Sequence, residues 1–157
     1  MPLSRIVYFS ESRIEPAERD AQLADLRRVA VSRNRRRQIT GALVYDDRWF
    51  AQALEGEIEF VEKTLDRIRR DPRHANIRIL SNAIAPERLF GNWSMGFAAR
   101  TLASEPLFGL HWFCAARNPS IMSEKSLLKL MLELGRQGFM GSAQNAVART
   151  PEPGLSP

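Results

Sequence analysis

The chain has 157 residues, of which 44% are hydrophobic and 26% charged, the composition of an ordinary globular protein. A chain of this length can bury a core without disulfides or a metal, and the one cysteine, Cys114, has no internal partner. We find neither a basic start followed by a long apolar run nor about 20 consecutive apolar residues, so we expect no secretory signal, no membrane span and a cytoplasmic location.

The net charge of +5 comes largely from residues 27–37, which hold six arginines. Such a patch can bind phosphate groups on nucleic acid, a nucleotide cofactor or an acidic partner. The arginines can equally complement the negative dipole at the end of a helix. Both interpretations stay open on charge alone.

The first half of the chain predicts two strands and a helix. Residues 3–9 alternate, with Tyr8 on one face and Phe9 on the other, which is typical of a strand. Pro16 and Asp20 lead into a helix whose apolar residues share one face: Leu23, Leu26 and Ala30. A second strand is expected over residues 39–45, followed by a turn at residues 46–48.

The predicted elements continue with a third strand over residues 49–54, closed by Gly56. A second helix presents Ile58, Val61, Leu65 and Ile68 on one face and ends before Asp71. Strands follow over residues 77–83 and 93–99.

The resulting order is β-α-β-β-α-β with an added fifth strand, an α+β arrangement of the ferredoxin-like kind. Its first and third strands are neighbours at the sheet centre. Tyr8 and Gln52 are therefore expected on adjacent strands, where alternation allows both to point toward the helices.

Beyond residue 100 we expect a C-terminal helical extension over 101–140 and a flexible tail over 141–157. The apolar segment 107–113 precedes a helix introduced by Pro119, and Gly135 is a candidate stop for that helix. The apolar side chains on this helix predict that it packs on the uncovered sheet face or forms a dimer surface: Leu127, Leu130, Met131 and Leu134.

The patterns of common enzymes are missing. His74 and His111 do not stand at metal-ligand spacing with Cys114 or with paired carboxylates, so no metal site is expected. A thiolate site at Cys114 and His111 is disfavoured because buried cysteines in apolar stretches are usually inert. The sequence has no phosphate-binding glycine loop or nucleophile elbow, and its strands lack the aromatic pattern of RNA-binding domains.

Some polar residues stand inside strands that are otherwise apolar. Gln52 lies in the middle of an apolar strand, where its amide must be hydrogen-bonded to be stable. By itself it would be explained as a helix cap or a water ligand. It occurs, however, together with Tyr8, Asn34, Trp93 and Met95 at a recognisable spacing.

These residues resemble the BLUF family, blue-light sensors that use flavin adenine dinucleotide. Asn34 precedes Gly41 by seven residues and Gln52 follows it by eleven. The resemblance covers residues 3 to about 100, in five segments that keep the order and spacing of the family: 6–10, 34–45, 50–56, 71–74 and 88–95.

The resemblance implies a role for each matching residue. Asn34 would hydrogen-bond the edge of the flavin ring, and Gln52 would bridge the ring and Tyr8, the electron and proton donor. The remaining matches are contacts near the flavin and two residues of the last strand that relay the signal: Ile39, Phe50, Arg67, Asp71 and Arg73 for the flavin, and Trp93 and Met95 for the relay. Trp93 and Met95 stand two residues apart on one face of that strand, and core packing explains them equally well. One departure is Arg33, where many relatives carry asparagine or histidine.

We therefore predict a short stand-alone photoreceptor over residues 1–100 that binds FAD, with FMN as a second option, and has no enzymatic activity. The signal would pass through a homo-oligomer or to a signalling protein in trans. The alternatives are a basic ferredoxin-like module that binds nucleic acid and, less favoured, a flavin redox enzyme.

Overall fold

The structure is a computed structural model that describes residues 2–112 and 122–141. Cys114, Pro119 and the predicted tail beyond residue 141 lie outside the described residues. The elements, in chain order, are β1 (Leu3–Ser12), a 3-10 turn η1 (Pro16–Glu18), α1 (Arg19–Arg36), β2 (Thr40–Tyr45), β3 (Trp49–Glu57), α2 (Ile58–Arg70), β4 (His74–Ile84), β5 (Gly96–Ala99), α3 (Glu105–His111) and α5 (Glu124–Arg136).

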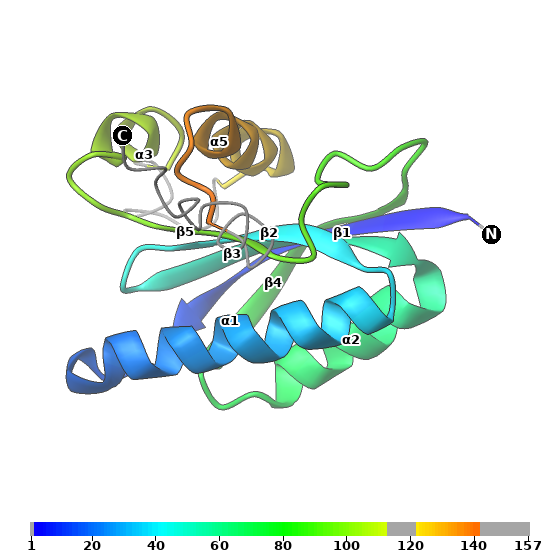
Figure 1. Cartoon of the computed structure of the whole chain (residues 1–157), viewed down its shortest axis with the longest axis horizontal. Helices are drawn as coiled ribbons and strands as arrows, with labels where there is room; N and C mark the ends of the chain where they lie inside the picture. The colour runs from blue at the N-terminus through cyan, green and yellow to red at the C-terminus, as the bar shows by residue number, and fades with distance from the viewer. Residues whose placement is uncertain (1, 113–121, 142–157) are drawn as a thin grey trace, which may run out of the picture.

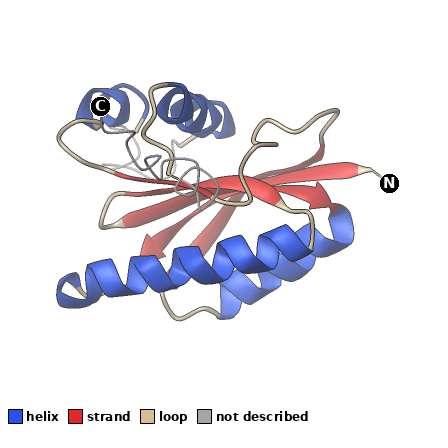
Figure 2. Cartoon of the chain, viewed as in Figure 1, coloured by secondary structure: helices blue, strands red, loops and turns tan. Residues whose placement is uncertain are grey.

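The strands form one sheet in the order β4-β1-β3-β2-β5, covered on both faces by helices. Figure 1 shows α1 and α2 together beneath the sheet and α3 and α5 above it. The neighbouring pairs are antiparallel except β2 with β5, which is parallel. The predicted ferredoxin-like α+β fold with a fifth strand is confirmed, and Figure 2 shows its layers by element type.

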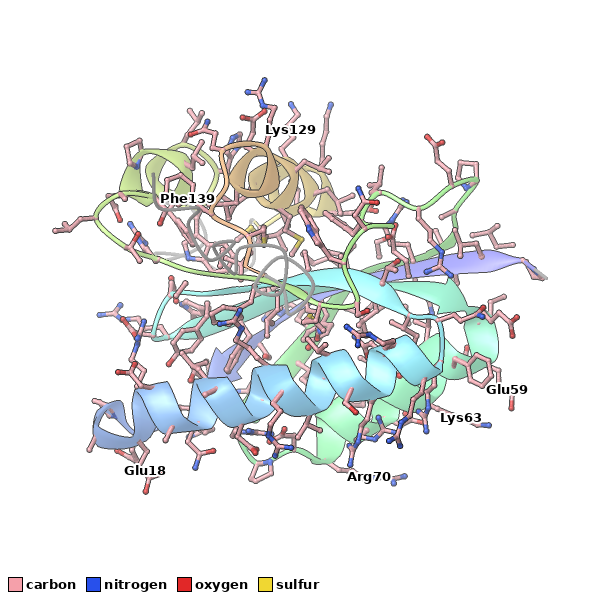
Figure 3. All side chains as sticks on the ribbon, viewed as in Figure 1. Glu18, Glu59, Lys63, Arg70, Lys129 and Phe139 are labelled. Atoms are coloured by element: carbon pink, nitrogen blue, oxygen red, sulfur yellow. The ribbon has the colours of Figure 1, made fainter. Side chains whose placement is uncertain are left out.

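The two sheet faces support separate apolar clusters, because each strand alternates between them. On the side of α1 and α2, Tyr8 and Phe50 pack with Leu23 and Leu26 of α1. On the other side, Val7 and Phe9 pack against Trp112 and the apolar face of α5. Charged side chains of the outer helices, such as Lys129 and the Glu59–Lys63 pair, lie on the outside of the layers (Figure 3).

The predicted face of α5 is fully buried, with Leu127, Leu130, Met131 and Leu134 each 0% exposed. The structure shows the first of the two arrangements predicted for this helix: α5 packs on the sheet face that α1 and α2 leave uncovered. The prediction that Gly135 ends this helix is wrong. The helix continues to Arg136, and Gly135 instead leaves room for the side chain of Trp93.

Several strand limits differ from the sequence prediction. β1, β3 and β4 are each longer, and β3 runs through Gly56 to Glu57 because β1 pairs with it along that whole length. β5 is shorter and begins at Gly96. The preceding residues form a turn, in which the backbone N–H of Trp93 donates to the carbonyl of Phe90 at 3.0 Å.

The chain returns to the sheet after α5. Phe97 of β5 exchanges both backbone hydrogen bonds with Gly141, at 2.8 and 3.0 Å. The outer edge of β5 is therefore paired at one residue by the segment that follows α5. Among the described residues, no helix is long and apolar enough to span a bilayer.

Candidate functional site

A cavity of about 630 Å³ lies between α1, α2 and the sheet. Its volume is within the range of pockets that hold cofactors, about 300–1,000 Å³. Apolar side chains from both helices form part of its wall, including Leu26, Ala30 and Ile68. Polar side chains reach it from the strands and the helix ends, so the cavity combines an apolar slot with a few directed polar groups.

Tyr8 and Gln52 meet beneath this cavity. They are directly opposite each other on β1 and β3, which confirms the predicted adjacency, and the Tyr8 hydroxyl donates to Gln52 Oε1. The Gln52 amide nitrogen donates in turn to Met95 Sδ at 3.4 Å. Gln52 and Met95 line the cavity, whereas Tyr8 is 0% exposed behind them.

The environment of Tyr8 keeps its proton in place. Burial raises the pKa of the Tyr8 phenol far above its ordinary value, and the Asp71 carboxylate raises this pKa further. The phenol is thus a neutral donor throughout the physiological pH range.

Asn34 joins the cavity to the turn before β5. It is buried near the end of α1, and its Nδ2 donates to the backbone carbonyl of Ser94 at 2.8 Å. One amide hydrogen of Asn34 is therefore bonded within the protein. Its remaining acceptor and second amide hydrogen are available at the cavity wall that this residue lines.

Asp71 and Arg73 form the end of the cavity nearest β4. The Arg73 guanidinium holds both Asp71 carboxylate oxygens, at 3.0 and 2.7 Å, and also reaches Asp25 of α1 at 3.3 Å. Burial alone would raise the pKa of Asp71, but these hydrogen bonds hold the pKa below its usual value. The network fixes the end of α2 against α1.

His74 is a cavity residue that was not predicted as part of the site. Ser10 Oγ lies 2.8 Å from its Nδ1, and its ring is 4.4 Å from that of Phe50. Burial lowers the pKa of His74 to about 4, so it is neutral at pH 7. Its only signal in the sequence is its place directly after Arg73 in the matching segment.

The other predicted residues divide by position. Arg67 lines the cavity, whereas Ile39 and Phe50 lie behind it in the apolar cluster on the same face. The prediction that Trp93 and Met95 share one face of a strand is wrong. They lie in the turn before β5, where alternation does not hold, and Trp93 packs with the α5 cluster while Met95 packs with the α1 cluster.

Trp93 fits between two glycines. A Cβ atom at Gly135 would lie 2.2 Å from Trp93 Cη2, and one at Gly96 would lie 3.0 Å from Trp93 Cε3. The missing side chain of Gly135 therefore lets the indole approach α5.

Glu55 anchors the loop that carries Trp93 and Met95. Its carboxylate, 0% exposed, pairs with Arg5 at 3.0 Å and accepts the backbone N–H groups of Leu89 and Phe90 at 2.7 and 2.9 Å. Sequence reasoning treated Glu55 only as part of a motif. An acidic residue at the end of an apolar strand was the available signal.

The arrangement places a proton donor, Tyr8, and a side-chain amide that can turn over, Gln52, beside the apolar part of the cavity. A carboxamide both donates and accepts, so turning Gln52 exchanges the bonds that it offers to Tyr8, to Met95 and to the cavity. Within residues 2–112 and 122–141, no group of three or more His, Cys, Asp or Glu residues is arranged to hold a metal.

Comparison with known proteins connects this geometry to a family. The model for the BLUF family, described as sensors of blue-light using FAD, matches residues 3–96. The beta subunit of photoactivated adenylate cyclase from Euglena gracilis is 37% identical over 94 residues, which are 59% of this chain and 11% of the relative. The chain thus matches about a tenth of the length of that relative.

Solved structures resemble the fold over more of the chain. The photo-activated state of BlsA matches with a TM-score of 0.72 and 32% identity, covering 84% of this chain and 94% of BlsA. BlrP1 of Klebsiella pneumoniae with FMN and cyclic diGMP matches with a TM-score of 0.55 and 30% identity, covering 62% of this chain and 26% of BlrP1.

Proposed function

The chain belongs to the BLUF family of blue-light sensors that use FAD, and we propose that it is a photoreceptor holding a flavin without a covalent bond. Its ring would occupy the cavity between α1 and α2, with Asn34 and Gln52 at its polar edge. Three observations support this fit: the cavity volume, the apolar walls from both helices, and the free hydrogen-bonding capacity of the two amides. FAD is the expected cofactor, and FMN is the second option.

A bound flavin would absorb blue light and, when excited, accept an electron. Tyr8 is the proposed donor, because its phenol is neutral and already donates to Gln52 Oε1. Losing an electron makes the phenol a strong acid, so its proton would move along that bond to Gln52 Oε1. The electron and the proton would then return to Tyr8, and the Gln52 side chain would be left rearranged, with a donor presented to the ring edge in place of its earlier bonds.

The energy scale suits a reversible switch. A single hydrogen bond contributes about 0.5–1.5 kcal/mol net, so exchanging one bond for another is reversed by thermal motion in the dark. The bond from Gln52 to Met95 lies beside this exchange, which gives the turn before β5 a direct contact with the rearranging amide.

The output would pass through residues 93–95 to α3 and α5 and from there to a signalling protein in trans or through a homo-oligomer. The photoactivated cyclase of Euglena is a far longer protein than its matching segment, whereas BlsA aligns over 94% of its length. We propose that the residues described here act as a sensor unit with no enzymatic activity of their own.

The observation that carries the proposal is the hydrogen-bonded contact of Tyr8 with Gln52 at the floor of the cavity. The test is to load the purified protein with FAD and record its absorption spectrum in the dark and under blue light. We expect a small red shift that reverses in the dark. Gln52→Leu and Tyr8→Phe should retain the flavin and lose the normal shift.

Tyr45→Phe is the matched control, because Tyr45 is a second buried tyrosine in the same cluster and has no bond to Gln52. It should leave the shift intact. Protein that cannot be loaded with flavin, or a normal shift in Gln52→Leu, would overturn the proposal.

A further inference from the structure

The segment before β5 is fastened to the end of α1 and to the start of β2. The Asn34 side chain donates to the carbonyl of Ser94 at 2.8 Å. The backbone N–H of Gly41 donates to the carbonyl of Trp93 at 3.1 Å. Met95 follows directly in the chain, so these two bonds determine the place from which its side chain reaches the cavity.

Arg88 adds a further connection between the same parts of the chain. Its Nη2 donates to the carbonyl of Gln38 at 2.8 Å. Its Nη1 donates to Thr40 Oγ1 at 2.8 Å and to the carbonyl of Glu55 at 3.1 Å. A guanidinium group presents several N–H donors in a fixed plane, so one side chain can bind all three oxygens at once. Arg88 thus joins its own loop to the turn after α1, to the first residue of β2 and to β3.

The turn that Arg88 holds has a strained backbone. Gln38 has a φ of 54°, in the left-handed region that favours glycine. Such a conformation persists where the surrounding structure determines it, and the bond from Arg88 to the Gln38 carbonyl is one of the contacts that do so. The carbonyl of Asn34 belongs to the same turn, because it accepts the N–H of Ile39 at 2.9 Å. The path of the turn and the placement of Asn34 are therefore linked.

We propose that Arg88 is a positioning residue for the light-driven switch. By holding the turn after α1, it keeps the Asn34 side chain on the carbonyl of Ser94. The position of Met95 beside the Gln52 amide depends on that contact. Arg88 does not line the cavity, so it acts through the residues that it holds. This inference rests on the proposed function, because it concerns the return of the rearranged amide to its dark state.

Neutralising a buried charge is the simpler role for an arginine beside Glu55. Arg5 has that role, because its Nε lies 3.0 Å from the buried Glu55 carboxylate. Arg88 binds the backbone carbonyl of Glu55 instead, and its other two bonds go to a carbonyl and a hydroxyl group. Its contacts join segments of the chain and do not pair charges.

The test measures dark recovery, the rate at which the red shift of the FAD-loaded full chain disappears in the dark. Arg88→Ala should slow it about threefold, because the dark-state bonds of Asn34 to Ser94 and of Gln52 to Met95 are both weakened. Arg88→Gln is a milder variant that stays polar but cannot span the three oxygens. It should slow recovery in the same direction.

Two control variants separate positioning from general loosening of the fold. Arg100→Ala removes another partly buried arginine, whose Nε donates to Glu105 at 2.7 Å and which does not contact the turn after α1. Gln38→Gly relieves the strained φ and keeps the carbonyl that Arg88 binds. Both variants should recover at the rate of the unaltered protein. Their free energies of unfolding in urea are measured alongside those of the Arg88 variants.

A double variant tests whether Arg88 acts through Met95. Adding Met95→Leu to Arg88→Ala should slow recovery less than Met95→Leu does alone, because the bond that it removes is already weakened. Fully independent effects would overturn the inference, as would normal recovery in both Arg88 variants or equal slowing in Arg100→Ala. A reversible red shift with unchanged rates refutes the role of Arg88 alone, whereas no red shift in the unaltered protein refutes the proposed function as well.

Discussion

Replacing Gly135 with alanine tests the contact between Trp93 and α5. The added Cβ would lie 2.2 Å from Trp93 Cη2 and 3.1 Å from Cζ2, and the indole cannot withdraw freely because it also touches Gly96. Overpacking of this kind costs about 1–3 kcal/mol. Alanine in a helix regains about 0.5–1 kcal/mol over glycine, so the expected net change is a loss of up to about 2.5 kcal/mol.

Gly109 of α3 is the matched control, because a Cβ there would meet nothing within 4 Å. Gly109→Ala should therefore gain about 0.5–1 kcal/mol of helix stability without a clash. The free energies of unfolding of both variants are measured by urea denaturation, and their difference should be about 1–3 kcal/mol.

A second mutation assigns the effect to Trp93. In a Trp93→Leu background the clash is removed, so Gly135→Ala should become neutral or stabilising. The reasoning is refuted if Gly135→Ala is as stable as Gly109→Ala, or if its cost is unchanged in the Trp93→Leu background.

Three further predictions follow from single contacts. Glu55→Gln should lower the free energy of unfolding, measured in urea, by about 3 kcal/mol, because Arg5 is left without its buried partner. A loss no larger than that of Glu57→Gln, on the same strand, would contradict a stabilising role for the Arg5–Glu55 pair. The free energy of unfolding should fall by about 2 kcal/mol between pH 7 and pH 5, because His74 has a pKa near 6.5 in the unfolded chain and of about 4 in the folded protein, so only the unfolded chain takes up a proton in this range. His74→Gln should reduce this dependence of stability on pH. An unchanged dependence would exclude His74 as its source. Met95→Leu should slow dark recovery by up to about twofold, because the dark state loses a bond from Gln52 worth about 0.5 kcal/mol; unchanged or faster recovery in the absorption assay would count against that bond.

The strand pairing at the centre of the sheet followed from sequence because local and global signals agreed. Alternation around Tyr8 and Gln52, together with the order of the elements, predicted adjacent central strands, and the observed register places these residues opposite each other. The face of α5 was equally readable from its apolar spacing.

The turn before β5 was not predictable in this way. Trp93 and Met95 stand two residues apart, which implies one face in a strand, yet both lie before β5, directly after a turn closed by the hydrogen bond from the Trp93 N–H to the Phe90 carbonyl. That turn is stabilised by Glu55, a residue far away in sequence. Likewise Gly135 reads locally as a helix end, and only its tertiary contact with Trp93 reveals a packing site.

The bridge between Phe97 and Gly141 determines where any following polypeptide is attached. A reporter module fused after Gly141 would begin its path at the edge of β5 and not at the end of α5. Met95 is two residues from Phe97, so a shift of β5 would directly move the point from which the fused module extends. A pair of fluorophores, one on α2 and one immediately after residue 141, is thus well placed to report motion of β5 as a change in energy transfer.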